Sequence, residues 1–115
     1  MVNALDVINE RVVRDGRVAI LVSHGYGAGW YTWHHKEELL YDPVIVDWVE
    51  RKVDNLEELV EAYIQGKYPE DDQPYLGGVG GLAIYWVKVG EQFRIDEYDG
   101  AESMVLESEA EWLTA

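Results

Sequence analysis

The sequence contains no cysteine, which excludes disulfide bonds, thiolate nucleophiles and cysteine-ligated zinc or iron–sulfur sites. Basic residues are scarce: 9 Lys and Arg stand against 23 Asp and Glu, so the formal net charge is −14 over 115 residues. No apolar run approaches the roughly 20 residues that a membrane-spanning helix needs. The first residues also lack the basic and apolar regions of a signal peptide. We therefore expect one domain over residues 1–115, located in the cytoplasm and without membrane contact.

The negative charge is concentrated toward the end of the chain. Half of the net charge falls between Glu91 and Ala115, where eight acidic residues face a single base, Arg94. Such a surface repels phosphate groups, so direct nucleic-acid binding is not expected. A basic partner protein is favoured instead, and the alternative is that the acidity only confers solubility.

The first third of the chain predicts a β-hairpin. Two β-rich runs flank Asp15-Gly16, a dipeptide that suits the positive φ angles of a type I′ turn. A helix over residues 3–14, with Gly16 as its stop, is the alternative that the sequence leaves open. The second run, Val18–Val22, is apolar at every position, which predicts a strand covered on both faces.

Two helices are expected in the middle of the chain. One covers Val44–Lys52, with Asp42 as its N-cap and Pro43 at the first helical position. The other covers Asp54–Gln65, with Asp54 as its cap and Gly66 as its end. Each carries its apolar residues at helical spacing, so each should pack one side against a sheet.

The last third predicts a three-strand meander over Leu82–Val89, Gln92–Tyr98 and Ser103–Glu107. Leu82–Val89 is apolar on both faces apart from Lys88, so we expect it to lie centrally in the sheet. The fold class is therefore α+β: a mostly antiparallel sheet, made of the N-terminal hairpin and the C-terminal meander, with one or two helices on one face.

The glycine-rich segment after the buried strand resembles a catalytic loop. His24-Gly25-Tyr26-Gly27 is similar to the oxyanion-hole loop of α/β-hydrolases. That fold also needs a G-x-S-x-G nucleophile elbow, which is missing here, and a chain about twice as long. A phosphate-binding loop is disfavoured too, because the segment carries no Lys or Arg. We expect these glycines to allow a tight turn beneath Trp30 and Trp33.

The same segment could serve a small ligand. A nucleotide-like molecule could stack on the aromatic residues Tyr26, Trp30, Tyr31 and Trp33. Arg94 would then serve as the counter-ion of the ligand. This hypothesis needs a concave basic pocket, formed if Arg94 joins the hairpin arginines Arg11, Arg14 and Arg17.

The three histidines lie close in sequence to carboxylates, in a pattern that does not predict a metal site. His34 and His35 are adjacent and point apart, and no H-E-x-x-H motif is present. A solvated polar turn is the expected structure around them. The sequence therefore predicts no metal, no cofactor and no catalytic residue.

Three segments together resemble small, uncharacterised acidic proteins encoded by phages and prophages: Arg17–Ser23, Gly25–Trp33 and Phe93–Gly100. The resemblance implies a mobile-element origin and a bacterial host cytoplasm. It implies no activity. Proteins of this kind are similar to host-directed binders, some of which imitate the charge of nucleic acid to occupy basic clefts.

Three functions follow as hypotheses. The first is a non-enzymatic protein that binds or inhibits a basic host or defence protein through acidic and aromatic residues, including Asp96, Glu97, Asp99 and Glu102. The second is the small-ligand binder that uses the Gly25–Trp33 loop, and the third is a small enzyme of unrecognised type. A contiguous acidic face favours the first, and a basic pocket beside the loop tryptophans favours the second.

Overall fold

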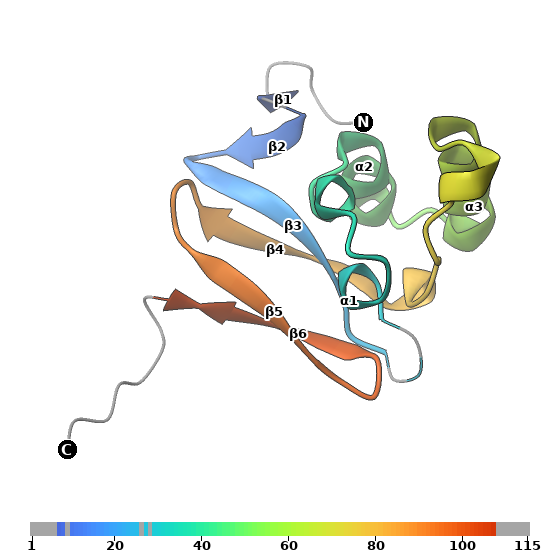
Figure 1. The fold of residues 1–115 in the computed structure, drawn as a ribbon. Helices are drawn as coiled ribbons and strands as arrows, with labels where there is room; N and C mark the ends of the chain where they lie inside the picture. Colours follow the sequence, from blue (N-terminus) through green and yellow to red (C-terminus); the bar gives the residue numbers. More distant parts are fainter. Residues whose placement is uncertain (1–6, 9, 26, 28, 108–115) are drawn as a thin grey trace.

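The computed structural model describes residues 7–8, 10–25, 27 and 29–107, and it has the predicted α+β architecture (Figure 1). The strands are β1 (Val7–Ile8), β2 (Arg11–Arg14), β3 (Arg17–Ser23), β4 (Leu82–Lys88), β5 (Phe93–Tyr98) and β6 (Ala101–Leu106). The α-helices are α1 (Tyr31–His34), α2 (Pro43–Arg51) and α3 (Leu56–Lys67). Three 3₁₀ turns complete the order: η2 (Glu37–Leu40), η3 (Glu70–Asp72) and η4 (Val79–Gly81).

The strands form two antiparallel sheets. Four strands pair in the order β1-β2-β3-β4, and β5 and β6 form a separate two-stranded hairpin. Asp15 and Gly16 have φ angles of 50° and 74°, and Asp99 and Gly100 repeat this pattern with 49° and 83°. Both Asp-Gly dipeptides therefore form type I′ turns. The predicted N-terminal hairpin is confirmed, and the described part of residues 3–14 forms strands rather than a helix.

Strand β3 lies between two apolar layers, which explains why every one of its central residues is apolar. Ala19 and Leu21 face α2 and α3 in a helix-side core: Val12, Ala19, Leu21, Trp30, Leu39, Ile45, Val46, Val60, Ile64 and Val79. The alternate residues face the other way, into a hairpin-side core of Val18, Ile20, Val22, Leu40, Tyr41 and Val87. Side chains of β5 and β6 pack against this second core. Burial on both faces is confirmed.

Helix α2 begins as the sequence predicts. Asp42 is 3% exposed, and its carboxylate accepts hydrogen bonds from the backbone N–H groups of Val44 and Ile45, at 2.9 and 3.2 Å. Its other oxygen accepts from the Tyr63 hydroxyl at 2.8 Å, which ties α2 to α3. The prediction for α3 is wrong at both ends: Asn55 precedes its first residue in place of Asp54, and Gly66 lies inside the helix.

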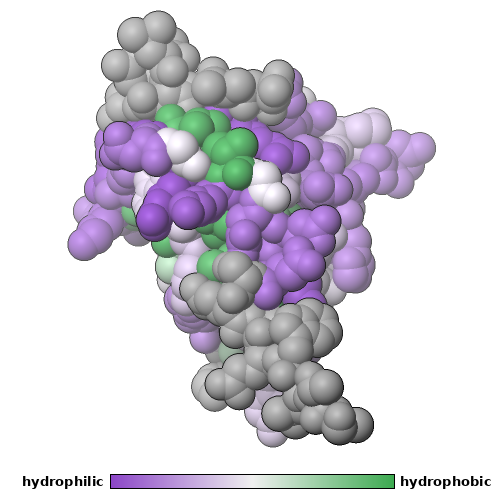
Figure 2. Space-filling model, turned by 90° about the vertical axis from the view of Figure 1, so that its left-hand side faces the viewer, coloured by the Kyte–Doolittle hydropathy of each residue, from purple (hydrophilic) through white to green (hydrophobic). Residues whose placement is uncertain are grey.

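The predicted three-strand meander is also wrong. β5 and β6 pair with each other, but β4 pairs with β3 over seven residues, from Leu82 opposite Ser23 to Lys88 opposite Arg17. β4 therefore lies at the end of the sheet order, not at its centre. None of the helices in the described ranges is long and apolar enough to span a membrane. The end of the molecule that carries the β2–β3 and β4–β5 turns is largely hydrophilic, with one small hydrophobic patch (Figure 2).

Candidate functional site

Two tryptophans three residues apart lie in opposite environments. Trp30 is fully buried in the helix-side core, and its indole N–H donates to the carbonyl of Leu39 at 3.2 Å. Trp33 lies in the short helix α1 and is 43% exposed. Trp30 therefore anchors the segment, and it is unavailable as the stacking platform that the small-ligand hypothesis required.

Glu102 fixes the position of α1 from the opposite hairpin. This residue of β6 is 2% exposed, and its carboxylate accepts three hydrogen bonds. Oε1 accepts from the Ser23 N–H at 3.0 Å, and Oε2 accepts from the N–H and the hydroxyl of Thr32 at 2.8 and 2.7 Å. The carboxylate thus satisfies one end of β3 and the first turn of α1 at once. Trp33 follows Thr32 directly, so Glu102, together with buried Trp30, positions the exposed indole.

A glycine is required beneath this turn. A Cβ atom on Gly29 would lie 2.5 Å from Thr32 Oγ1, 2.7 Å from Trp33 Cδ1 and 3.1 Å from the Gly100 carbonyl. Gly27 has a φ of +108°, a conformation that side chains disfavour. Both observations agree with the prediction of a tight glycine turn beneath the tryptophans.

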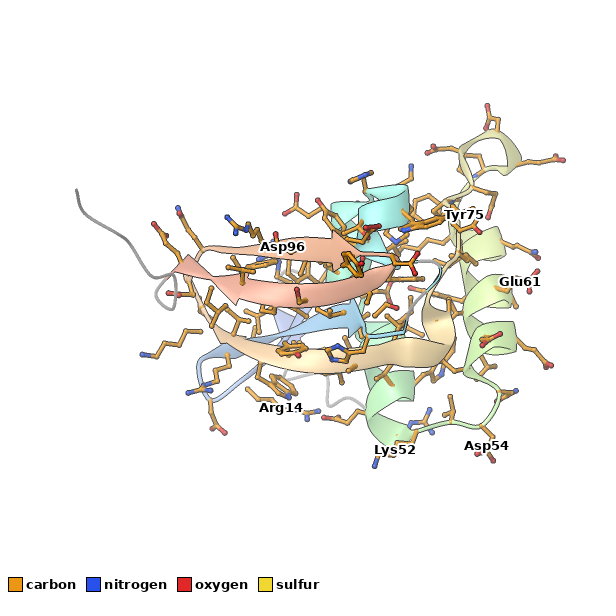
Figure 3. The ribbon with its side chains drawn as sticks, turned by 90° about the horizontal axis from the view of Figure 1, so that it is seen from below. Arg14, Lys52, Asp54, Glu61, Tyr75 and Asp96 are labelled. Carbon is orange, nitrogen blue, oxygen red and sulfur yellow. The ribbon has the colours of Figure 1, made fainter. Side chains whose placement is uncertain are left out.

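Trp33 forms an exposed stack with a residue from a distant segment. Its ring centroid lies 5.3 Å from that of Tyr75, with an interplanar angle of 31°, and Tyr75 is 58% exposed. The Trp33 indole N–H also donates to Glu97 Oε2, on β5, at 3.3 Å. Figure 3 shows Tyr75 between α1 and α3, beyond the end of the β5–β6 hairpin. We call Trp33, Tyr75 and Glu97 the aromatic–acidic surface.

An ion pair holds the segment that leads to Tyr75. The Lys36 ammonium lies 2.9 Å from both carboxylate oxygens of Asp72 and 5.1 Å from the centre of the Tyr68 ring. The Tyr68 hydroxyl in turn donates to Glu38 at 2.7 Å, which lowers the pKa of Glu38. These contacts hold the start of the connection on η2, so an ion pair and a hydrogen bond fix the segment that leads to Tyr75.

The acidic residues proposed for partner binding do not form one face. Asp96 points outward from the hairpin and pairs with Arg94 at 3.0 Å, whereas Glu97 points toward Trp33. Asp99 lies in the β5–β6 turn, and its carbonyl accepts from the Gly27 N–H at 2.6 Å. Glu102 is buried, so its assignment to a partner surface is wrong. Asp96 and Glu97 are separated because neighbours in a strand point to opposite faces, whereas Glu97 and Glu102 are register partners on one face and differ in burial.

The structure also separates the elements of the small-ligand hypothesis. Tyr26 lies outside the described residues, and Tyr31 is half-buried with its ring against those of His34 and His35. Arg94 forms an ion pair with Asp96. Arg14 and Arg17 line a cavity of about 440 Å³ together with Trp86, not with the loop tryptophans, and Arg14 is paired with Glu50. No basic pocket beside Trp33 is formed by the described residues.

The candidate hydrolase and metal residues are not arranged for chemistry. His24 packs edge-on against Tyr85, and the buried Ser23 hydroxyl has no hydrogen-bond partner among the described residues. His34 accepts from the Lys36 N–H through Nδ1 at 2.8 Å, and burial lowers its pKa to about 4. Within the described ranges, no three His, Asp or Glu residues converge as a metal site.

Tyr75 is the residue of this surface that sequence analysis missed. It lies in the connection between α3 and β4, which carries no periodic signal. The number of aromatic residues indicated that some are exposed, but only the folded chain shows which of them meet. Comparisons of the chain with protein-family models, with curated proteins and with solved structures found no match.

Proposed function

We propose that this protein is a non-enzymatic binding protein that engages a basic protein partner through the aromatic–acidic surface. The observation that carries the proposal is the exposed stack of Trp33 on Tyr75, with the Glu97 carboxylate on the indole N–H. An aromatic pair that remains 43% and 58% exposed leaves much apolar area in water, which a partner would cover.

The chemistry of this surface favours a cationic side chain. A guanidinium or ammonium group placed over an indole or phenol ring gains about 0.5–1 kcal/mol when exposed and about 2 kcal/mol when desolvated. Glu97 would supply the opposite charge at the edge of the same ring. The net charge of −14 would also draw a basic partner from a distance and increase its rate of association.

An anionic small ligand is disfavoured by the same features. Trp30 is buried, Arg94 is paired, and the group that accepts from the exposed indole N–H is itself a carboxylate. The resemblance to phage-encoded proteins adds a host or defence protein as the class of partner. Inhibition of that partner, and a place in the host cytoplasm, are parts of the same proposal.

A peptide-binding experiment tests the proposal. Fluorescence anisotropy would follow a labelled peptide of alternating Arg and Gly as the protein is added, with a Glu-Gly peptide and ATP as anionic probes. We expect saturable binding of the Arg peptide and none of the anions. Trp33→Ala and Tyr75→Ala should each weaken binding about tenfold, which corresponds to roughly 1.4 kcal/mol.

The control is an aromatic substitution on the neighbouring β5–β6 hairpin. Tyr98 is 78% exposed and takes part in none of the ring contacts of the described residues. Tyr98→Ala keeps the net charge, as Trp33→Ala does, so general attraction to an acidic protein is equal in both. Equal affinity of the two variants would contradict the proposal, and binding of ATP that depends on Trp33 would favour the small-ligand function.

A further inference from the structure

Strand β4 has the sequence of a central strand and the position of an edge strand. Its residues Leu82–Val87 are all apolar, yet among the strands that the structure describes it pairs only with β3 and ends the four-stranded order. Chains usually protect a sheet edge with charged residues, proline or a bulge. β4 has seven regular pairs, no proline and one charged residue, Lys88, at its end.

The register shows which backbone groups face the open edge. Val89 donates to Gly16 and His24 donates to the Gly81 carbonyl, so β4 turns the backbone of residues 81, 83, 85, 87 and 89 toward β3. The intervening residues Ile84 and Trp86 therefore direct both their N–H and their C=O groups away from β3. Lys88 adds an outward N–H. Figure 3, which views the sheet from this side, shows no described ribbon in front of β4.

The two-stranded sheet of β5 and β6 has a different composition at its edge. β5 has Arg94, Asp96 and Glu97 among its six residues, which is the usual protection of an exposed edge. The contrast leaves β4 as a sheet edge without this protection among the described strands.

Carboxylates beside the start of β4 indicate the charge that a covering chain would meet at this end of the strand, whereas Arg17 and Lys88 lie at the other end. A cavity of about 390 Å³ adjoins Gly80, just before β4, and is lined by residues 53–58 with the carboxylates of Asp54, Glu57 and Glu58. None of its lining residues is basic. Asp54 and Glu58 are exposed, and Figure 3 shows Asp54 below the sheet, on the helix side. The opposite side of β4 presents the ring of Tyr85, which is 37% exposed.

We propose that the open edge of β4 binds an extended segment of a basic partner protein, which adds a fifth strand to the sheet. The segment would exchange backbone hydrogen bonds with Ile84 and Trp86. Its side chains would alternate, with cations toward Asp54 and Glu58 on the helix side and apolar groups beside Tyr85. A second copy of this chain is a poor occupant, because each copy carries a net charge of −14. The proposal does not depend on the aromatic–acidic surface.

The test uses a capped seven-residue peptide of alternating Lys and Val and measures its affinity by calorimetry. Lys88→Pro removes one outward N–H and leaves the β3 pairing, because proline is tolerated at edge positions whose N–H faces solvent. Lys88→Thr removes the same charge and keeps the N–H. We expect Lys88→Pro to bind at least fivefold more weakly than Lys88→Thr. Asp54→Asn with Glu58→Gln should weaken binding by a similar factor.

N-methylated peptides test backbone pairing directly. Methylating alternate residues blocks the N–H groups on one edge of the peptide only. One of the two half-methylated peptides should retain binding and the other should lose it. Equal binding of both peptides, or equal affinity of Lys88→Pro and Lys88→Thr, would overturn the proposal, and so would the absence of binding.

Two further measurements identify the occupant of the β4 edge and separate this edge from the aromatic–acidic surface. A dimer in sedimentation equilibrium that Lys88→Pro dissociates would show that the occupant is a second copy, and would overturn the proposal as stated. Trp33→Ala should leave binding of the Lys-Val peptide unchanged, so failure at one surface is distinguishable from failure at the other.

Discussion

Glu102 should be among the most costly carboxylates to remove from this protein. Its side chain is 2% exposed and accepts three hydrogen bonds, two of them from backbone N–H groups. Truncation to Ala leaves those three donors without the acceptor that they now have. Each hydrogen bond to a charged group contributes about 1.5–3 kcal/mol, and the recovered cost of burying the charge offsets part of the sum. We expect Glu102→Ala to lower the free energy of unfolding by about 3–5 kcal/mol.

Replacing Glu102 with glutamine should also lower the stability of the protein. In Glu102→Gln the amide oxygen can still accept hydrogen bonds from Thr32. The side-chain NH₂ group then faces the backbone N–H of Ser23, so two hydrogen-bond donors lie opposite each other in a buried position. This change should cost about 1–3 kcal/mol. For a chain of this length, each kcal/mol corresponds to about 4 °C in Tm. Urea titrations followed by circular dichroism measure both variants.

Glu97 provides the matched control. It is the register partner of Glu102 across the hairpin, but it lies in an exposed environment. Glu97→Ala should change the free energy of unfolding by about 0.5 kcal/mol or less. If Glu102→Ala costs no more than Glu97→Ala, then the carboxylate does not hold α1, and the role given to it in positioning Trp33 is wrong.

Two other predictions concern the same region. Gly29→Ala should destabilise the fold by about 1–3 kcal/mol, because its Cβ would overlap Thr32 and Trp33, whereas Gly25→Ala has no atom within 4 Å and should be tolerated. Equal thermal shifts of these two variants would refute the packing argument. Burial lowers the pKa of His34 from 6.5 to about 4 in the folded protein. Between these pH values the unfolded chain carries the His34 proton and the folded protein does not, so the free energy of unfolding should fall as the pH drops from 6.5 to 4. Allowing for partial solvent screening, the loss is about 1–2 kcal/mol, and His34→Gln should abolish that part of the pH dependence in urea titrations; an unchanged slope would contradict it.

The sequence predicted the elements better than their partners. The Asp-Gly turns, the Asp42 cap and the burial of β3 follow from local chemistry, because a turn, a cap and an apolar run each have a short-range cause. The pairing of β4 with β3 joins residues that lie far apart in the chain, such as Ser23 and Leu82, so no local signal separates it from a meander. The same limit applies to the site, where Trp33 was a candidate and Tyr75 was not.

The charge pattern was the least reliable guide to the site. Asp96, Glu97, Asp99 and Glu102 are close in sequence, but Asp96 pairs with Arg94, Glu97 lies against an indole, Asp99 lies in the turn and Glu102 is buried. Glu102 in particular could not be identified from composition, because its burial depends on the ends of β3 and α1 meeting β6. The sequence does not distinguish a glutamate that is buried as a hydrogen-bond acceptor from one that is exposed to solvent.

We propose that a cationic partner covers the Trp33–Tyr75 stack, and nuclear magnetic resonance of the indole N–H groups would detect this contact. The chain has five tryptophans, so five indole signals are expected in a ¹⁵N-correlated spectrum, and single Trp→Phe variants assign them. Titration with the Arg-Gly peptide should shift the Trp33 signal in a saturable way and leave that of buried Trp30 unchanged. Saturable binding that leaves the Trp33 signal unmoved would contradict the claim.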